Sequence, residues 1–238
     1  MINLVFSADP DEDVEGQFIA SDMHRKDINV MHLACQENLI ETVKFILETD
    51  LAQVEFKSAA GWTPLMTACE AGHIDVIDLI VEAAVNKLEL LEYRCESGSA
   101  LHAAITGHKP LETVQYLIEK FENVGIDEGE PDYVETVINK KDLSDIHPLF
   151  LSVFQGNTDV TKALLEQGAD PTQASDPNGV TLLHICAERG YTELCALICV
   201  MTPQLVFEKD DEGNTALHVV CNWDYLDIVK TLCDVADS

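Results

Sequence analysis

Basic residues are scarce in this chain of 238 residues. Lysine and arginine number 14 against 43 aspartates and glutamates, and the formal net charge is −29. Binding to nucleic-acid phosphates or to an anionic membrane surface requires a basic patch, so we predict no nucleic-acid partner. Acidic residues concentrate at 9–15 and 122–135. A solvated surface is the simpler interpretation of these runs, and an electrostatic docking site is the alternative.

Long hydrophobic runs are also missing. The longest uncharged apolar stretch, Leu194–Phe207, is interrupted by Pro203 and is too short to cross a bilayer. The first 13 residues are acidic and poor in apolar side chains, unlike a secretion signal. We therefore predict no direct membrane insertion and a cytoplasmic location, with the nucleus as an alternative.

Sequence signatures of catalysis are absent. The chain contains no G-x-x-x-x-G-K phosphate loop, no G-x-G-x-x-G turn, no G-x-S-x-G elbow and no H-E-x-x-H pair. No carboxylate is distinguished by its spacing from a solvated surface residue. We predict that this chain is not an enzyme and has no catalytic residues and no cofactor; a hydrolytic or metal-binding protein is kept as a remote alternative.

The chain instead contains an internal repeat. Related stretches read GWTPLMTACEAGHIDVIDLI at 61–80, NGVTLLHICAERGYTELCALI at 178–198 and EGNTALHVVCNWDYLDIVKTL at 212–232. Six anchor hydrophobes recur at spacings of 34, 36, 48, 34 and 34 residues: Met31, Leu65, Leu101, Leu149, Leu183 and Leu217. A period of this length predicts a solenoid, in which each unit buries its apolar face only by stacking on its neighbours.

Residues 61–80 show the physics of one unit. Gly61 allows a tight turn, the Thr63 hydroxyl can cap the amides of a helix, and Pro64 suits the first helical position. Gly72 can adopt the left-handed conformation that ends this helix, and an Ile/Val-rich helix follows it. Each unit is therefore predicted to be a turn followed by two antiparallel helices.

The other units depart from this pattern at a few places. The cap position is polar and short in five units but is His147 in the fourth, where Asp145 or Ser144 is expected to cap instead. Asn38 and Asp224 replace the glycine between the helices of the first and last units, and both tolerate the left-handed region. A one-residue insertion predicts a reshaped turn around Pro110 in the third unit.

These residues resemble the ankyrin repeat, whose period is about 33 residues. The resemblance rests on a turn glycine, Thr-Pro-Leu-His or a variant of it, Gly-His, and an Ile/Val-rich helix, and it covers residues 25–236. It implies an all-α solenoid of six helix-turn-helix units with β-turn fingers. We expect an acidic extension at 1–24 and a repeat domain at 25–238, with an acidic insertion at about 119–136.

The insertion accounts for most of the long interval between the third and fourth anchors. Pro131 and the acidic residues after it suit the first turn of a short extra helix. Long insertions of repeat arrays often carry binding, but a tolerated surface loop is the simpler expectation.

Cysteine and histidine recur at repeat positions. Cys35 and Cys69 occupy the same place in successive helices and are predicted to be reduced core residues. Four histidines directly follow an anchor: His32, His102, His184 and His218. The resemblance implies that they bond to neighbouring turns, so we predict no metal site.

The same resemblance implies where a partner binds. Ankyrin-like arrays use the turn tips and the exposed side of each first helix, on the concave face. The predicted partner-binding residues at such positions are Trp62, Glu70, Phe154, Gln155, Glu188, Arg189, Asp211, Glu212, Asn222 and Trp223. Trp62, Phe154 and Trp223 are the expected apolar anchors, because aromatic residues are enriched among binding hot spots. The competing interpretation is that Trp62 packs on a neighbouring turn and Trp223 seals the last unit.

We therefore predict a non-catalytic scaffold that binds a protein with a Lys/Arg-bearing surface on its concave face. The alternative is the regulatory ankyrin segment of a larger enzyme or channel. Knowing whether the natural reading frame extends beyond Ser238 would separate the two.

Overall fold

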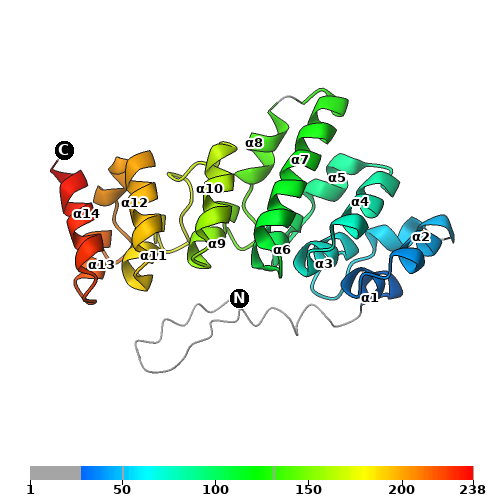
Figure 1. Ribbon diagram of the computed structural model, residues 1–238, viewed down its shortest axis with the longest axis horizontal. Helices are drawn as coiled ribbons and strands as arrows, with labels where there is room; N and C mark the ends of the chain where they lie inside the picture. Colours follow the sequence, from blue (N-terminus) through cyan, green and yellow to red (C-terminus); the bar gives the residue numbers. More distant parts are fainter. Residues whose placement is uncertain (1–27, 50, 131, 238) are drawn as a thin grey trace.

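The structure, a computed structural model, describes residues 28–49, 51–130 and 132–237. The expected extension at 1–24 lies outside these residues. Six helix pairs follow one another along the chain and form two rows in Figure 1. The inner helices are α1 (Val30–Gln36), α3 (Pro64–Ala71), α6 (Ala100–Thr106), α9 (Pro148–Phe154), α11 (Leu182–Arg189) and α13 (Ala216–Val220). The outer helices are α2 (Ile40–Thr49), α4 (Ile74–Ala83), α7 (Pro110–Glu128), α10 (Thr158–Glu166), α12 (Thr192–Met201) and α14 (Leu226–Ala236).

The inner helices begin where the cap residues predict. The Thr63 hydroxyl accepts the backbone N–H of Met66 at 3.3 Å, and Pro64 is the first residue of α3. The Asn29 side chain accepts the N–H of His32 at 3.0 Å in the same way. Each bond satisfies an amide that has no partner within the helix, so the local sequence determines the helix start.

The breaks between the two helices of a unit also follow the prediction, with one exception. Gly72, Gly156 and Gly190 have φ of 72°, 68° and 76°, and Asn38 has φ of 54°. Asp224 does not adopt a positive φ, so the expectation for the sixth unit is wrong. There α13 ends at Val220, and a run of turn residues leads to α14, which makes a left-handed residue at 224 unnecessary.

The cap of the fourth unit differs from the prediction. Neither Asp145 nor Ser144 caps α9, and His147 occupies the cap position without a side-chain cap bond. The buried Asp142 carboxylate instead accepts the N–H groups of Ser144 and Ile146 at 2.8 and 2.9 Å. This turn is held by a residue five positions before the helix cap, too far away for capping rules to identify.

The third unit has the reshaped turn that the insertion predicts. The helix α6 ends before Gly107, and α7 begins at Pro110. A Cβ atom at Gly107 would lie 2.3 Å from the carbonyl oxygen of Glu70 in the preceding unit. The backbone of His108 donates to that same oxygen at 2.9 Å. Glycine is therefore required here because two backbones approach closely.

The acidic insertion is helical rather than a surface loop. It extends α7 to 19 residues and adds α8 (Tyr133–Ile138), the extra helix that the sequence predicts. The rings of Phe121 and Tyr133 meet edge to face with centroids 6.3 Å apart, and both side chains are buried. The insertion thus buries apolar surface of its own while presenting its acids to solvent.

The connections between units contain structure that the repeat pattern does not predict. Short 3₁₀ helices follow two outer helices: η1 (Leu51–Glu55) and η2 (Pro203–Phe207). The helix α5 (Lys87–Glu92) precedes a hairpin of β1 (Arg94–Cys95) and β2 (Gly98–Ser99), paired antiparallel. This hairpin is the β-turn finger of the third unit.

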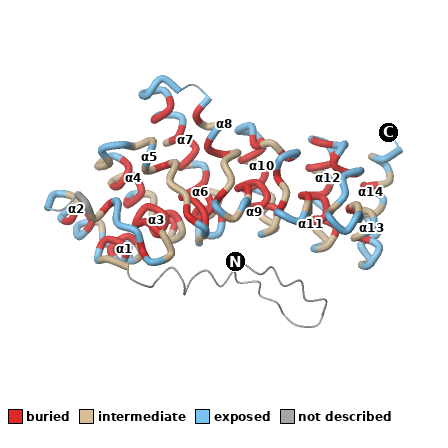
Figure 2. The backbone as a smooth tube through the Cα atoms, turned by 180° about the vertical axis from the view of Figure 1, so that it is seen from behind, coloured by how far each residue is buried: buried red, intermediate tan, exposed pale blue. Residues whose placement is uncertain are grey.

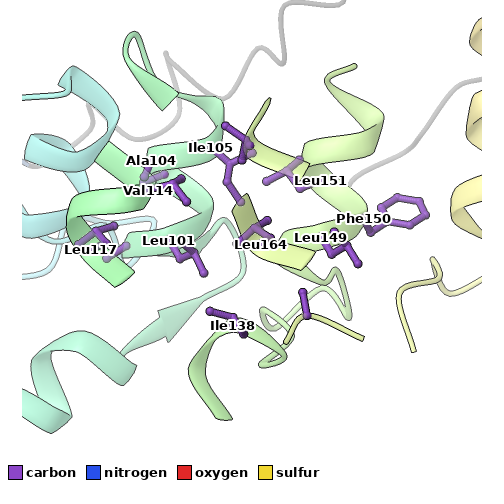
Figure 3. Close-up of a cluster of buried hydrophobic side chains, with 14 of the residues drawn as sticks. Leu101, Ala104, Ile105, Val114, Leu117, Ile138, Leu149, Phe150, Leu151 and Leu164 are labelled. Atoms are coloured by element: carbon purple, nitrogen blue, oxygen red, sulfur yellow. The ribbon is translucent and has the colours of Figure 1, made fainter. Parts of the chain in front are cut away.

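One hydrophobic core extends along the stack. Figure 2 shows buried residues along the facing sides of the helices and exposed residues at the turns. The first five anchors are at most 1% exposed, whereas Leu217 of the last unit is half-buried. Figure 3 shows Leu101 and Leu149 among the side chains that join units three and four. Within the part of the chain that the structure describes, no helix is long and apolar enough to span a membrane.

The cysteines follow the prediction. All eight are free thiols, and six of them, including Cys35 and Cys69, are buried. Burial raises the pKa of Cys35 to about 12, because an apolar environment disfavours the thiolate. Cys35 and Cys69 are therefore packing residues.

Replacing Leu183 with alanine should lower the free energy of unfolding by about 2–5 kcal/mol, through lost burial and a residual cavity. Leu183 is fully buried, whereas Leu226 is 59% exposed. Leu226→Ala is the matched control and should change stability by about 0.5 kcal/mol or less. Urea denaturation followed by circular dichroism measures both. Equal effects of the two substitutions would contradict the repeat register.

Candidate interaction surface

Histidine bridges set the register of neighbouring units. The Ser99 hydroxyl donates to Nδ1 of His102 at 2.8 Å, and Nε2 of His102 donates to the carbonyl of Ile146 at 3.0 Å. His184 makes the same pair of bonds, to Thr181 and to the carbonyl of Asn214. Each ring therefore joins its own helix cap to the backbone just before the next cap, as the resemblance implies.

The predicted partner-binding positions lie on the surface formed by the turn tips and the ends of the inner helices. We call it the inner face and define it by the turn tips at 58–62, 95–98, 142–146, 176–180 and 210–214 together with the last turns of the inner helices. Five of the predicted partner-binding residues are exposed there: Gln155, Arg189, Asp211, Glu212 and Asn222. Another four are half-buried: Glu70, Phe154, Glu188 and Trp223.

Trp62 does not belong to this set. Its side chain is only 4% exposed and is part of the hydrophobic core, so the expectation that it stands outside the core is wrong. The backbone carbonyl of Trp62 accepts a hydrogen bond from Nε2 of His32 at 2.9 Å. The backbone N–H of Trp62 donates to the Ser58 hydroxyl at 3.1 Å. Trp62 lies directly before the Thr63 helix cap, at the base of the finger.

Phe154 and Arg189 meet across two units of the inner face. The guanidinium carbon of Arg189 lies 4.8 Å from the centroid of the Phe154 ring, a cation–π geometry. The same ring stacks on Phe150 of its own helix, with centroids 6.5 Å apart and planes at 15°. The Phe154 ring is thus stacked on Phe150 and partly covered by the Arg189 cation.

Glu188 places a carboxylate beside this pair. Partial burial raises the pKa of Glu188, because the charged form loses hydration, while the positive charge of Arg189 acts in the opposite direction. A carboxylate in this position gains more from an approaching cation than a fully hydrated one, because part of its hydration has already been lost.

The sixth unit adds an acidic turn tip and a second aromatic pair. Asp211 and Glu212 are exposed at the tip, and Asp211 donates its N–H to the carbonyl of Asn178 in the adjacent tip at 3.0 Å. Trp223 stacks on Tyr225 with centroids 6.4 Å apart and planes at 18°. Tyr225 in turn lies against Gly190, where a Cβ atom would come within 2.8 Å of its ring.

Two further apolar features are exposed, and sequence reasoning missed the second of them. Leu143, at the tip of the fourth turn, is 60% exposed. A groove of about 260 Å³ lies between η1 and α5 and is lined by Val54, Val85, Leu90 and Tyr93 among others. The longer interval between the second and third anchors, with its apolar residues at 85–91, was the available signal for the groove.

The described residues contain no group of three or more His, Cys, Asp or Glu side chains that could hold a metal ion. His32 and Cys35, three residues apart on α1, have separate roles. The histidine bonds to turns, and the cysteine packs in the core.

Comparison with known proteins identifies the family. The family model for ankyrin repeats (3 copies) matches residues 10–90, 31–132 and 149–238. These matches cover most of the chain, which therefore belongs to the ankyrin repeat family. Ankyrin repeats are protein-interaction modules, and this defines the class of the chain.

Individual relatives are more distant. The chain is 27% identical over 190 residues to NF-kappa-B inhibitor zeta of Homo sapiens, covering 76% of this chain and 24% of that protein. It is 27% identical over 172 residues to the probable E3 ubiquitin-protein ligase XBOS32 of Oryza sativa subsp. japonica, covering 64% of this chain and 33% of that protein. The chain thus spans a quarter to a third of the length of these relatives.

Solved structures support the fold. The ankyrin repeat protein EF0377 matches with a TM-score of 0.68 at 20% identity, covering 87% of this chain and 98% of that one. A chain in the complex of the Bd0816 predatory endopeptidase from Bdellovibrio bacteriovorus with immunity protein Bd3460 matches with a TM-score of 0.69 at 19% identity. That match covers 88% of this chain and 99% of the other.

One buried histidine makes stability depend on pH. His147 is 3% exposed, and its Nε2 is a buried atom without a hydrogen-bond partner. Burial lowers the pKa of His147 to about 4, and the nearby positive charge of Lys141 acts in the same direction. In the unfolded chain the pKa is about 6.5, so the folded state binds fewer protons between these two values.

The contribution of His147 to the free energy of unfolding should therefore fall as the pH is lowered from about 6.5 to about 4, the window between its unfolded and folded pKa values. In a His147→Thr variant this loss should be smaller, because threonine does not titrate and suits the cap position. Urea denaturation at pH 7 and at pH 4.5 compares the two proteins. Equal losses in both would show that His147 does not contribute to the pH dependence.

Proposed function

We propose that this chain is a non-catalytic scaffold that binds a partner protein on its inner face, the concave face of the predicted array. The observation that carries the proposal is the arrangement of Phe154, Glu188 and Trp223 on successive units. Their side chains are half-buried, and the Phe154 ring packs against the core while also meeting Arg189 of the next unit. Large aromatics beside polar groups are typical of binding hot spots.

The charge of the chain indicates the kind of partner. With a net charge of −29, most of the surface repels acidic proteins and attracts basic ones. At the sixth tip, Asp211 and Glu212 are exposed and extend this field beyond the helices. We infer a partner with a lysine- or arginine-bearing surface, and a cytoplasmic or nuclear location for the pair.

Each residue has a distinct role in this proposal. Phe154 and Trp223 supply apolar contact area, and Glu188 pairs with a cation of the partner. Arg189, Gln155 and Asn222 supply hydrogen bonds at the edges of the contact. Glu70, Asp211 and Glu212 act over longer distances by increasing the rate of encounter.

A second proposal follows from the lengths of the relatives. Because the matched region is a minor part of NF-kappa-B inhibitor zeta and of XBOS32, this array is also a candidate regulatory segment of a longer protein. Sequencing the natural transcript around both ends of this reading frame tests that proposal directly.

Affinity purification with the immobilised chain, followed by mass spectrometry, identifies the partner. A Phe154→Ala/Trp223→Ala variant should lose about 2 kcal/mol or more of binding free energy, roughly a thirty-fold rise in Kd, mainly through faster dissociation. Phe45→Ala is the control, because Phe45 is 65% exposed on the outer helix α2. Both variants must first be shown to melt like the parent. Unchanged affinity of the folded double variant would reject the inner face as the docking site.

Charge reversal at the sixth tip should act on the rate of association. An Asp211→Lys/Glu212→Lys variant should bind the same partner more slowly and with a weaker dependence on salt, because salt screens long-range attraction. Surface plasmon resonance at two ionic strengths measures both quantities. A change confined to the dissociation rate would contradict electrostatic steering.

A further inference from the structure

Directional hydrogen bonds join most neighbouring units of the array. His32 reaches the carbonyl of Trp62 between units one and two, and His108 donates to Glu70 between units two and three. Units three and four share the His102 bridge and two bonds between their turn tips. Units five and six share the His184 bridge and the bond from Asp211 to Asn178. These bonds fix the angle between units because hydrogen bonds are sensitive to direction.

The junction between units four and five is built differently. Phe150 stands where units one, three, five and six have the histidine and unit two has Met66, so no imidazole reaches the next cap from unit four. Pro177 occupies the tip position of Leu143 and Asp211, whose N–H groups bond to the preceding tip. Proline has no N–H to donate. Among the described residues, no backbone hydrogen bond joins these two tips, and the ion pair between the units is the exposed contact of Lys162 with Glu193.

Contacts without strong directionality take the place of these bonds. The Phe150 ring points away from the side chains shared with unit three, as Figure 3 shows. It supports Phe154, which meets Arg189 of unit five, and the Tyr191 ring lies against Gly156. The helices α9 and α11 contact each other less extensively than other successive inner helices do.

We propose that the junction between units four and five is a hinge. Units one to four form one block, and units five and six form another. Apolar and cation–π contacts depend weakly on orientation, so a small rotation at this junction breaks no backbone hydrogen bond. The units stack in one dimension, and each contacts only its neighbours. The two blocks therefore move relative to each other at this interface, where no backbone hydrogen bond joins the described turn tips.

The hinge lies under the proposed docking surface, and its functional consequence rests on the proposed function. Phe154 belongs to the first block, and Glu188, Arg189 and Trp223 belong to the second. Rotation at the junction changes the separation between these residues. A partner bound across them therefore selects one angle, and the inner face can adapt to its ligand.

Spin labels at equivalent positions test the hinge without a partner. Asp75, Asp159 and Asp227 are exposed in the first turns of α4, α10 and α14, at the same place in units two, four and six. Cys221 and Cys233 are first replaced with serine because they are the accessible thiols. Double electron–electron resonance then compares Asp75→Cys/Asp159→Cys with Asp159→Cys/Asp227→Cys. Each pair spans two junctions, but only the second spans the hinge.

We expect a broader or multiple-peaked distance distribution for the second pair. Rebuilding the junction should narrow it. The rebuilt variant, His147→Thr/Phe150→His/Pro177→Asp, restores the Thr-Pro-Leu-His pattern and copies the Asp-Asp tip of unit six. Pro177→Asp alone, which leaves the aromatic packing intact, is the fallback if the triple variant does not fold, and it should narrow the distribution partly.

Equal widths for the two label pairs in the parent would overturn the hinge. So would a broad distribution that the folded rebuilt variant, or Pro177→Asp in its place, leaves unchanged. Either result concerns the mechanics of the array alone and leaves the proposed docking surface open to its own binding test.

Discussion

A helix pair of this size cannot bury its apolar face alone, and the rest of the structure depends on that constraint. The anchors of the first five units are almost completely buried because a neighbour covers each of them, whereas Leu217 of the sixth remains half-buried. Stacking therefore supplies the core, and the caps and histidine bridges determine the register in which the units stack. A change in one unit is felt first by its neighbours.

The same constraint decides which side chains are available for recognition. Side chains that face a neighbouring unit form the core. Trp62, at the base of a finger, is also part of this core. What remains is the inner face, where Glu188 and Phe154 are only half-buried. In the proposed function, the high negative charge adds a long-range preference for basic partners, and the aromatic residues supply contact area at short range.

The repeat, the helix pairs and most caps could be predicted because they depend on local chemistry. Thr63, Pro64 and Gly72 each act within one turn of the backbone. The sequence did not predict Asp142 as the residue that holds the fourth turn or the extension of α7 with the buried Phe121, and it gave the burial of Trp62 only as the competing interpretation. Each of these depends on contacts between segments that the period alone does not bring together. For the candidate site, the repeat register predicts which positions belong to it. The register does not predict which of these positions are exposed, because exposure depends on packing.

Departures from the repeat carry information that the family pattern does not. A histidine in place of Phe150 would bond to the next unit, but it would not support the Phe154 ring from below. The substitution that removes a directional bond from the junction therefore also builds the aromatic surface on the inner face. The proposed hinge and the aromatic surface lie at the same place because both depend on Phe150, which stands where four of the other five units have a hydrogen-bonding histidine.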